Sequence, residues 1–168
     1  MITNKKIENE EYPDYEKYRQ MILAFLRLEK SIIKTKLANL LYLADFAWFY
    51  NNLKSMSGMQ YRKIQSGPVA DSYCRVIDEM YDQGEIRINQ IKEGEMLISA
   101  TKSGNKLPLS KIERPEFALI KEVEEKWKDK KTTEIVDFTR KQMPCVFARD
   151  NEIVSYDVFG QENPNEIF

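Results

Sequence analysis

Apolar residues recur at intervals of three and four along several stretches of the chain, which predicts amphipathic helices. The first of these stripes comprises Tyr15, Tyr18, Ile22, Phe25 and Leu26. Pro13 precedes it, and proline is favoured in the first turn of a helix, so we expect a helix over 13–28. A second helix is expected over 35–53, with Thr35 as its N-cap. Because it is apolar on nearly every side, it is expected to be the buried central helix.

A third helix is expected to begin at Pro68, with Ser66 or Gly67 as its cap, and to end at Gly84. Its apolar face would comprise Val69, Tyr73, Val76, Ile77, Met80 and Tyr81. The preceding segment has no helical period, so we expect a loop with a short extended piece at 59–64.

Ile86 and Ile88 alternate with polar residues, a turn follows at Glu93-Gly94, and residues 96–101 predict a second strand. This pattern indicates a β-hairpin. After a linker, two more helices are expected. One carries the stripe Phe117, Ile120, Val123 and Trp127, and the other is capped by Thr132 or Thr133 and carries Ile135, Val136 and Phe138.

These elements predict a mainly α fold of the α+β class, formed by one domain over 1–168. It would be a compact bundle of about five helices around the apolar central helix, with one β-hairpin in a winged-helix-like order. Residues 1–12 are charged and are expected to be flexible. Residues 143–168 keep many apolar side chains and are expected to pack across the body.

The composition favours a folded, soluble protein, since 42% of the 168 residues are hydrophobic and 32% are charged. The net charge of -1 provides no overall attraction to nucleic acid or anionic lipid. The longest apolar run, residues 37–50, is shorter than a membrane span of roughly 20 residues. No membrane partner is expected. The lack of a secretory leader and the unpaired cysteines favour a cytoplasmic location.

The chain contains no histidine, which excludes Ser-His-Asp and Cys-His catalysis. Cys74 and Cys145 are far apart in the sequence and supply too few ligands for zinc. Cys74 lies beside the apolar face of the third helix and is expected to be buried. We therefore expect no catalytic residues, no metal, no cofactor and no enzymatic activity.

Asp45 is the only acid in the apolar central helix. A buried carboxyl needs a hydrogen-bond partner, so pairing with a neighbouring side chain or a loop N–H is expected. The alternative is an enzyme that works through Asp45 and nearby tyrosines. A phosphate loop at Gly67-Pro68 is disfavoured, because there is one glycine and the proline removes a backbone donor.

In a winged-helix fold the helix before the wing reads DNA. Here that helix carries Asp71, Asp78, Glu79 and Asp82, and residues 67–87 have a net charge of -3. This charge opposes contact with phosphates, and nucleic acid is not expected as a partner. Residues 34–63 have a net charge of +4. A DNA-binding alternative would therefore use Lys34, Lys36, Arg62 and Lys63.

Two motifs together resemble the SocA-like antitoxin family, also called the Panacea domain. The first is the helix with Lys36-Leu37 followed by Leu-Leu-Tyr-x-Ala-Asp over 40–45. The second is Tyr61 before Gly67-Pro68-Val69, with a following helix that ends near Gly84. The resemblance covers 34–88 and continues more loosely into 132–144. Family members often have a Ser-His-Glu-x-x-Pro-Trp-like segment there, whereas this chain has no histidine and Cys145 follows Pro144.

The resemblance implies a phage-associated, antitoxin-like module that binds and neutralises a toxin encoded nearby. Neutralisation would occur by direct binding, or by delivery of the toxin to a protease or chaperone. The residues expected at or near the partner are those of the two motifs: Tyr42, Asp45, Tyr61, Gly67, Pro68, Val69 and Tyr73. The alternative function is a winged-helix-like transcriptional regulator that binds DNA.

Overall fold

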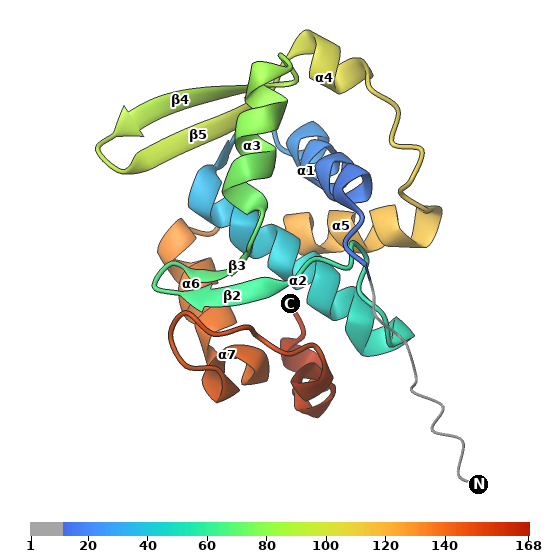
Figure 1. The fold of residues 1–168 in the computed structure, drawn as a ribbon, viewed down its shortest axis with the longest axis vertical. Coiled ribbons are helices and arrows are strands. Elements are labelled where there is room, and N and C mark those ends of the chain that lie inside the picture. Colours follow the sequence, from blue (N-terminus) through green and yellow to red (C-terminus); the bar gives the residue numbers. More distant parts are fainter. Residues whose placement is uncertain (1–11) are drawn as a thin grey trace, which may run out of the picture.

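Residues 12–168 of this computed structural model are described, and they form helices and two small antiparallel sheets around one central helix (Figure 1). The α-helices are α1 (Tyr15–Leu28), α2 (Lys34–Asn52), α3 (Tyr73–Asp82), α4 (Lys102–Lys106), α5 (Arg114–Trp127), α6 (Thr132–Lys141) and α7 (Met143–Phe147). Two 3-10 turns follow, η1 (Asp157–Gln161) and η2 (Pro164–Glu166). The strands are β1 (Ile32–Ile33), β2 (Tyr61–Ile64), β3 (Gly67–Ala70), β4 (Ile86–Lys92) and β5 (Glu95–Ala100).

The α+β class is confirmed. The described residues contain seven α-helices, whereas about five were expected. They also contain a second hairpin, β2–β3, which the periodicity did not indicate. Residues 1–12 were expected to be flexible, and residues 1–11 lie outside the described part of the chain. Within the described part, no helix is long and apolar enough to cross a membrane.

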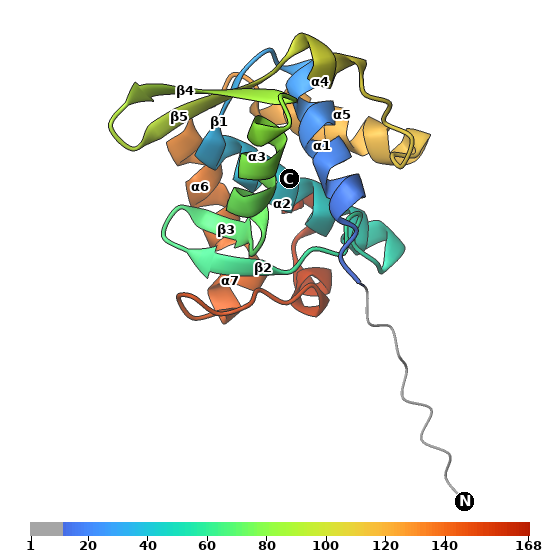
Figure 2. The ribbon, with the colours of Figure 1, turned by 45° about the horizontal axis from the view of Figure 1, so that its top comes forward.

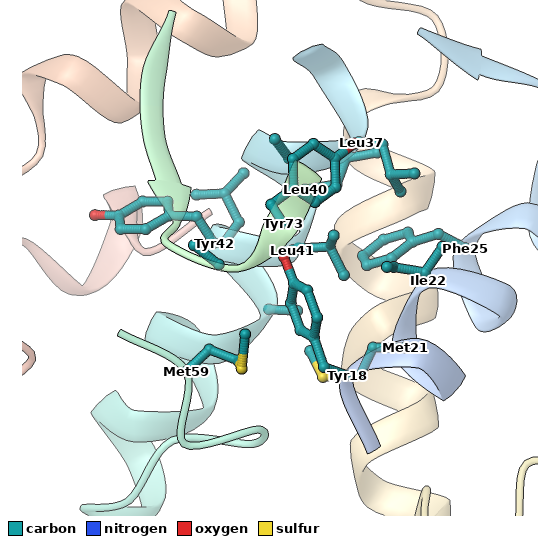
Figure 3. Packing of buried hydrophobic residues seen from close by; sticks show 14 of the residues in the cluster. Tyr18, Met21, Ile22, Phe25, Leu37, Leu40, Leu41, Tyr42, Met59 and Tyr73 are labelled. Carbon is teal, nitrogen blue, oxygen red and sulfur yellow. The ribbon is translucent and has the colours of Figure 1, made fainter. Parts of the chain in front are cut away.

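The central helix is α2, in which every residue from Lys36 to Ala47 is buried. Apolar side chains of α1 pack on it, including Ile22 and Phe25, which lie beside Leu37 and Leu40 (Figure 3). Burial of a side chain of this size contributes roughly 1.5–3 kcal/mol. Helices α5 and α6 pack on other sides of α2, so its nearly uniform apolar surface is used all round.

The start of α2 differs from the expected one. The helix begins at Lys34, directly after β1, and Thr35 lies inside its first turn. Ile33 occupies the N-cap position and makes no side-chain capping bond. The β1 strand that precedes it pairs with β5, Ile32 opposite Ile98. Sheet pairing, rather than a capping side chain, therefore determines where α2 begins.

The hairpin predicted after Gly84 is present as β4 and β5, with Ile88 opposite Ile98. Strand β1 joins it to give the order β1-β5-β4. The hairpin extends away from the helices in both views (Figures 1 and 2). At the base of the hairpin, the hydroxyls of Thr101 and Ser103, at the start of α4, donate to Gly84 O (2.6 and 2.9 Å).

The prediction that a helix begins at Pro68 is wrong. Residues Gly67–Ala70 form β3, which pairs with β2, and α3 begins only at Tyr73. Lys63 lies opposite Pro68 but uses its own N–H and C=O for Glu152 and Asn151. The missing N–H of the proline therefore costs no ladder hydrogen bond, which is why a strand tolerates proline there.

The C-terminal residues 143–168 lie against α2 and β2. Val154 and Phe159 are fully buried, and the ring of Tyr156 stacks on Phe46 with 4.1 Å between centroids. Cys145 is also buried in this region, whereas Cys74 is exposed, contrary to the expectation for Cys74. Cys74 lies on the polar side of α3, one residue away from the buried face that begins with Tyr73.

Candidate functional site

The Asp45 side chain is fully buried in the middle of α2 and holds the following loop in place. Its Oδ1 accepts a hydrogen bond from Ser57 N (2.7 Å). Its Oδ2 accepts from Ser57 Oγ (2.6 Å) and from the Tyr61 hydroxyl (2.7 Å). This arrangement agrees with the expected pairing of Asp45 to a side chain and a loop N–H. The buried Asp45 carboxyl group anchors β2 through Tyr61. It is not accessible to a substrate, as the enzymatic alternative would require.

Burial and the nearby carboxylate of Asp45 raise the pKa of the Tyr61 hydroxyl well above its ordinary value. Tyr61 therefore keeps its proton and donates to Asp45. Its ring also makes edge-on contacts with Tyr42 and Phe46, with centroids 5.7 Å away in each case. The first residue of β2 is thus held by both polar and aromatic contacts with α2.

Gly67 lies at a junction of α2, α6 and the turn between β2 and β3. Asn39 donates from Nδ2 to Thr35 O (2.9 Å) and to Ser66 O (3.0 Å). Thr139 Oγ1 donates to Asn39 Oδ1 (2.7 Å), and both side chains are fully buried. Gly67 has φ = +99°, a backbone conformation that favours glycine.

Asn39 and Thr139 were not among the candidates from the sequence. Asn39 carried a usable signal, because a polar side chain in a helix buried on all sides requires partners. Thr139 carried no comparable signal, since its contact with Asn39 spans 100 positions of the chain. Such a pairing depends on where α6 lies against α2.

Tyr73 joins the start of α3 to the start of α2, since its hydroxyl donates to Lys34 O (2.6 Å). The Tyr42 hydroxyl is buried and has no hydrogen-bond partner among the described residues. Burial raises the pKa of both hydroxyls well above the ordinary value. Both hydroxyls therefore stay protonated and uncharged in the interior of the protein.

Of the seven motif residues proposed near the partner, six are buried and only Val69 is partly exposed. The buried ones are Tyr42, Asp45, Tyr61, Gly67, Pro68 and Tyr73. The structure brings all seven together around the β2–β3 hairpin and the middle of α2. These residues thus hold the hairpin against α2, and Val69 is the one among them that reaches the surface.

Three strand-like segments share that outward face. Arg62 lies opposite Val69 in β3 and forms a β-bridge with Ile153 on its other side. Residues opposite each other in antiparallel strands point to the same face, so Arg62, Val69 and Ile153 are neighbours there. Ile64, two residues after Arg62, points the same way. The opposite face carries Tyr61, Pro68 and Ala70, which are buried.

The bases of the DNA-binding alternative are largely engaged inside the protein. Lys36 is buried, and its Nζ donates to Lys130 O (2.8 Å) and Lys128 O (3.3 Å). Lys63 Nζ donates to Cys145 O (2.8 Å) and Ala148 O (3.0 Å).

Arg62 pairs with Asp71, with 2.9 Å between Nε and Oδ1, and donates to Asn151 O (2.6 Å). Lys34 is the fourth base, and it is partly exposed. Phosphate binding would have to displace most of these contacts, which weakens the DNA-binding alternative. Within residues 12–168, no group of three or more Cys, Asp or Glu side chains is placed to hold a metal ion.

Comparison with curated proteins and with solved structures found no match to this chain. A family model described as antitoxin SocA-like, Panacea domain, matches residues 37–145, well over half of the chain. The match extends beyond the stretch 34–88 on which the resemblance rested. It includes both hairpins, Asp45 with its partners, and the junction of Gly67, Asn39 and Thr139. The chain therefore belongs to the SocA-like antitoxin family with a Panacea domain.

Proposed function

We propose that this chain neutralises the toxin of a toxin–antitoxin pair by binding it directly, in the cytoplasm and without enzymatic activity. The observation that carries the proposal is the family match over 37–145. Membership in this family supports a role related to toxin–antitoxin pairs. Direct binding fits the geometry, because the motif residues hold the β2–β3 hairpin against α2 and its outward face is partly exposed.

The contact region of the proposal is the outward face of β2 and β3 together with residues 151–153. Val69 and Ile64 are partly exposed there, and Ile153 is exposed. The β2 backbone is tied to residues 151–154 by hydrogen bonds from Lys63 N to Glu152 O (2.9 Å) and from Val154 N to Tyr61 O (3.0 Å). A face that is ordered before binding loses less conformational entropy when a partner docks.

The proposal is tested by expressing each adjacent gene, alone and together with this chain. We expect one product to arrest growth alone, growth to resume on co-expression, and the two proteins to co-elute from a size-exclusion column. If neither neighbour is toxic, or if the toxic one is restrained without forming a complex, direct neutralisation is wrong.

Neutralisation by sequestration and by delivery to a protease predict different toxin lifetimes. Sequestration leaves the toxin present in the complex, whereas delivery shortens its half-life in cells that contain this chain. A chase of tagged toxin after synthesis is stopped, with and without this chain, separates the two routes. We propose sequestration as the basic activity, since it requires only the two proteins.

A further inference from the structure

A cleft of about 280 Å³ lies between α1, Glu85 at the start of the β4–β5 hairpin, and the segment 107–111. Pockets for drug-sized ligands measure roughly 300–1,000 Å³, so a cleft of this size fits a small ligand. None of the described residues that line it belongs to β2, β3 or 151–153, so it is separate from the contact region proposed above. Its buried and partly buried lining consists of Arg19, Gln20, Leu23, Glu85 and Leu107.

The walls of this cleft are held by hydrogen bonds within the protein. On one side, Thr101 N donates to Glu85 O (3.0 Å) and fixes the backbone at the base of the hairpin. On the other side, Lys111 N donates to Gln20 Oε1 (2.7 Å) and ties the segment 107–111 to α1. The cleft is therefore formed before a ligand enters, which lowers the entropic cost of binding.

The charged side chains of the cleft largely neutralise one another. Arg19 pairs with Glu85, with 2.5 Å between Nη2 and Oε1. Lys111 pairs with Asp14, with 2.8 Å between Nζ and Oδ2. Glu16 is exposed at the rim and lies 4.0 Å from Arg19 Nη1. An anion would meet the carboxylates and a cation would meet Arg19 and Lys111, so a neutral ligand fits the cleft best.

Two polar groups of the cleft lack hydrogen-bond partners. Gln20 is only 4% exposed, and while its Oε1 accepts from Lys111 N, its Nε2 donates no hydrogen bond within the described residues. Glu85 Oε2 is enclosed and also has no hydrogen-bond partner there. A buried polar group without a partner is costly, so each of these groups favours a ligand that supplies one. The ligand should therefore carry both an acceptor and an N–H donor.

The rest of the lining is largely apolar. Leu23 is buried, Leu107 is partly buried and Pro108 is exposed at the rim. Ligand sites commonly combine apolar walls of this kind with a few polar groups that fix the orientation of the ligand. An apolar ring can pack on these side chains while its polar end reaches Gln20 and Glu85.

We propose that this cleft binds a small neutral carboxamide, in which the amide group is carried on a flat apolar ring. The amide oxygen accepts from Gln20 Nε2, and the amide N–H donates to Glu85. The ring packs on Leu23 and Leu107. Because Glu85 Oε2 is enclosed, binding requires a small rotation of this carboxylate, through which the oxygen gains the donor that it lacks. The inference goes beyond the proposed function, since it assigns a small-molecule ligand at a separate site.

The test uses the purified full chain and three probes of nearly equal shape, followed by amide NMR. Benzamide is neutral, benzoate is an anion and benzamidine is a cation at pH 7. Benzamide should shift the side-chain amide signals of Gln20 and the backbone signals of Leu107 and Lys111. The shifts should saturate with a Kd on the order of 1 mM, as expected for a ligand of this size. Benzoate and benzamidine should bind at least about tenfold more weakly.

Gln20→Glu tests the amide donor. This substitution keeps an oxygen that can accept from Lys111 N but replaces the Nε2 donor with a second acceptor. The Kd for benzamide should therefore rise at least about tenfold.

Ser110→Trp tests the cleft without changing a buried residue. Ser110 is exposed and lines the cleft, so a bulky ring at this position should block the entry of benzamide. The matched control is Lys141→Trp, since Lys141 is exposed on α6 and does not line the cleft. It should change the Kd less than about twofold, and both tryptophan variants should keep the wild-type melting temperature.

Three outcomes would overturn the assignment, and none of them bears on toxin binding. If no probe shifts the signals of the cleft at about 10 mM, the cleft binds no ligand of this class. If benzoate or benzamidine binds as tightly as benzamide, the cleft does not select a neutral amide. If Gln20→Glu and Ser110→Trp both bind benzamide as the wild type does, the ligand binds elsewhere.

Discussion

Gly67 lies directly against the side-chain amide of Asn39, and a β-carbon built on its backbone would stand 2.4 Å from Asn39 Oδ1. The same β-carbon would be 3.2 Å from Thr139 Oγ1. The backbone of Gly67 thus lies too close to a buried amide of α2 for a side chain to fit between them. A side chain there would separate the hydrogen-bonded pair Asn39–Thr139 or displace the β2–β3 turn.

Replacement of Gly67 by alanine is expected to destabilise the protein by about 3 kcal/mol or more, through steric overlap with Asn39 and an unfavourable φ. The measurement is the free energy of unfolding in urea. Gly84→Ala is the matched control, because Gly84 also has a positive φ (+74°) but has no atom within 4 Å of the added carbon.

The control should cost about 1–2 kcal/mol, the strain of the left-handed backbone alone. Equal losses in the two variants would show that the contact with Asn39 contributes nothing to the stability of the hairpin.

Tyr61→Phe is expected to cost about 1.5–3 kcal/mol, because it removes a hydrogen bond to the buried Asp45 carboxyl group. Tyr42→Phe removes a hydroxyl of equal size that is buried without a hydrogen-bond partner among the described residues. Its effect should lie near zero or be stabilising, since an unsatisfied polar group is costly to bury. Urea unfolding of the two variants side by side compares the hydroxyls directly. A larger loss for Tyr42→Phe would contradict the assignment of Tyr61 as the anchor.

The two thiols should differ in reactivity. Burial raises the pKa of the Cys145 thiol to about 12, although Lys63 and Arg140 lower it in part. Because the thiolate is the reactive form, iodoacetamide at pH 8 should modify the exposed Cys74 and leave Cys145 unmodified. Mass spectrometry of the peptides reports both sites, and modification in urea should label both. Rapid labelling of native Cys145 would indicate that α7 opens readily.

Stability should also depend on pH through Glu124. Burial raises its pKa, an effect that Lys128 opposes and Glu125 reinforces. The folded chain therefore binds this proton more readily than the unfolded chain does. Its contribution to stability is fully present below the ordinary pKa near 4.5 and is lost as the pH rises through the higher folded-state pKa.

Glu124→Gln removes the charge that burial disfavours and should raise the urea midpoint at pH 7. The difference from the wild type should shrink as the pH falls through the raised folded-state pKa of Glu124, because the wild-type carboxyl group then gains its proton. The matched control is Glu122→Gln, because Glu122 is exposed on the same helix. A wild type that is more stable than Glu124→Gln at pH 7 would mean that the carboxylate has a stabilising partner.

The spacing of apolar residues predicted the helices around the core, because apolar residues must recur every three or four positions on a helix that buries one side. The stripe Phe117, Ile120, Val123 and Trp127 lies on α5, and its last three residues are buried. The hairpin of β4 and β5 was predicted for a similar reason, since alternation and a Glu-Gly turn act locally. The hydrogen bonds of Asp45 to Ser57 and Tyr61 likewise follow from the need of a buried carboxyl group for polar partners.

Gly67-Pro68-Val69 shows what local pattern cannot settle. The proline favours a helix start when only its neighbours are considered, whereas the tertiary structure places it in a strand. That choice depends on β2, on residues 151–153 and on Asn39, which are distant in the sequence. The burial of Lys36 and the exposure of Cys74 also depend on the tertiary structure, because a side chain is buried only where another segment covers it.

The sequence by itself thus determined the buried central helix, the β4–β5 hairpin and the family, because these depend on periodicity and short motifs. Only the tertiary structure decided that the motif residues lie mostly in the interior. The physical reason is that exposure depends on contacts between distant segments, such as Lys63 with Cys145 and Ala148.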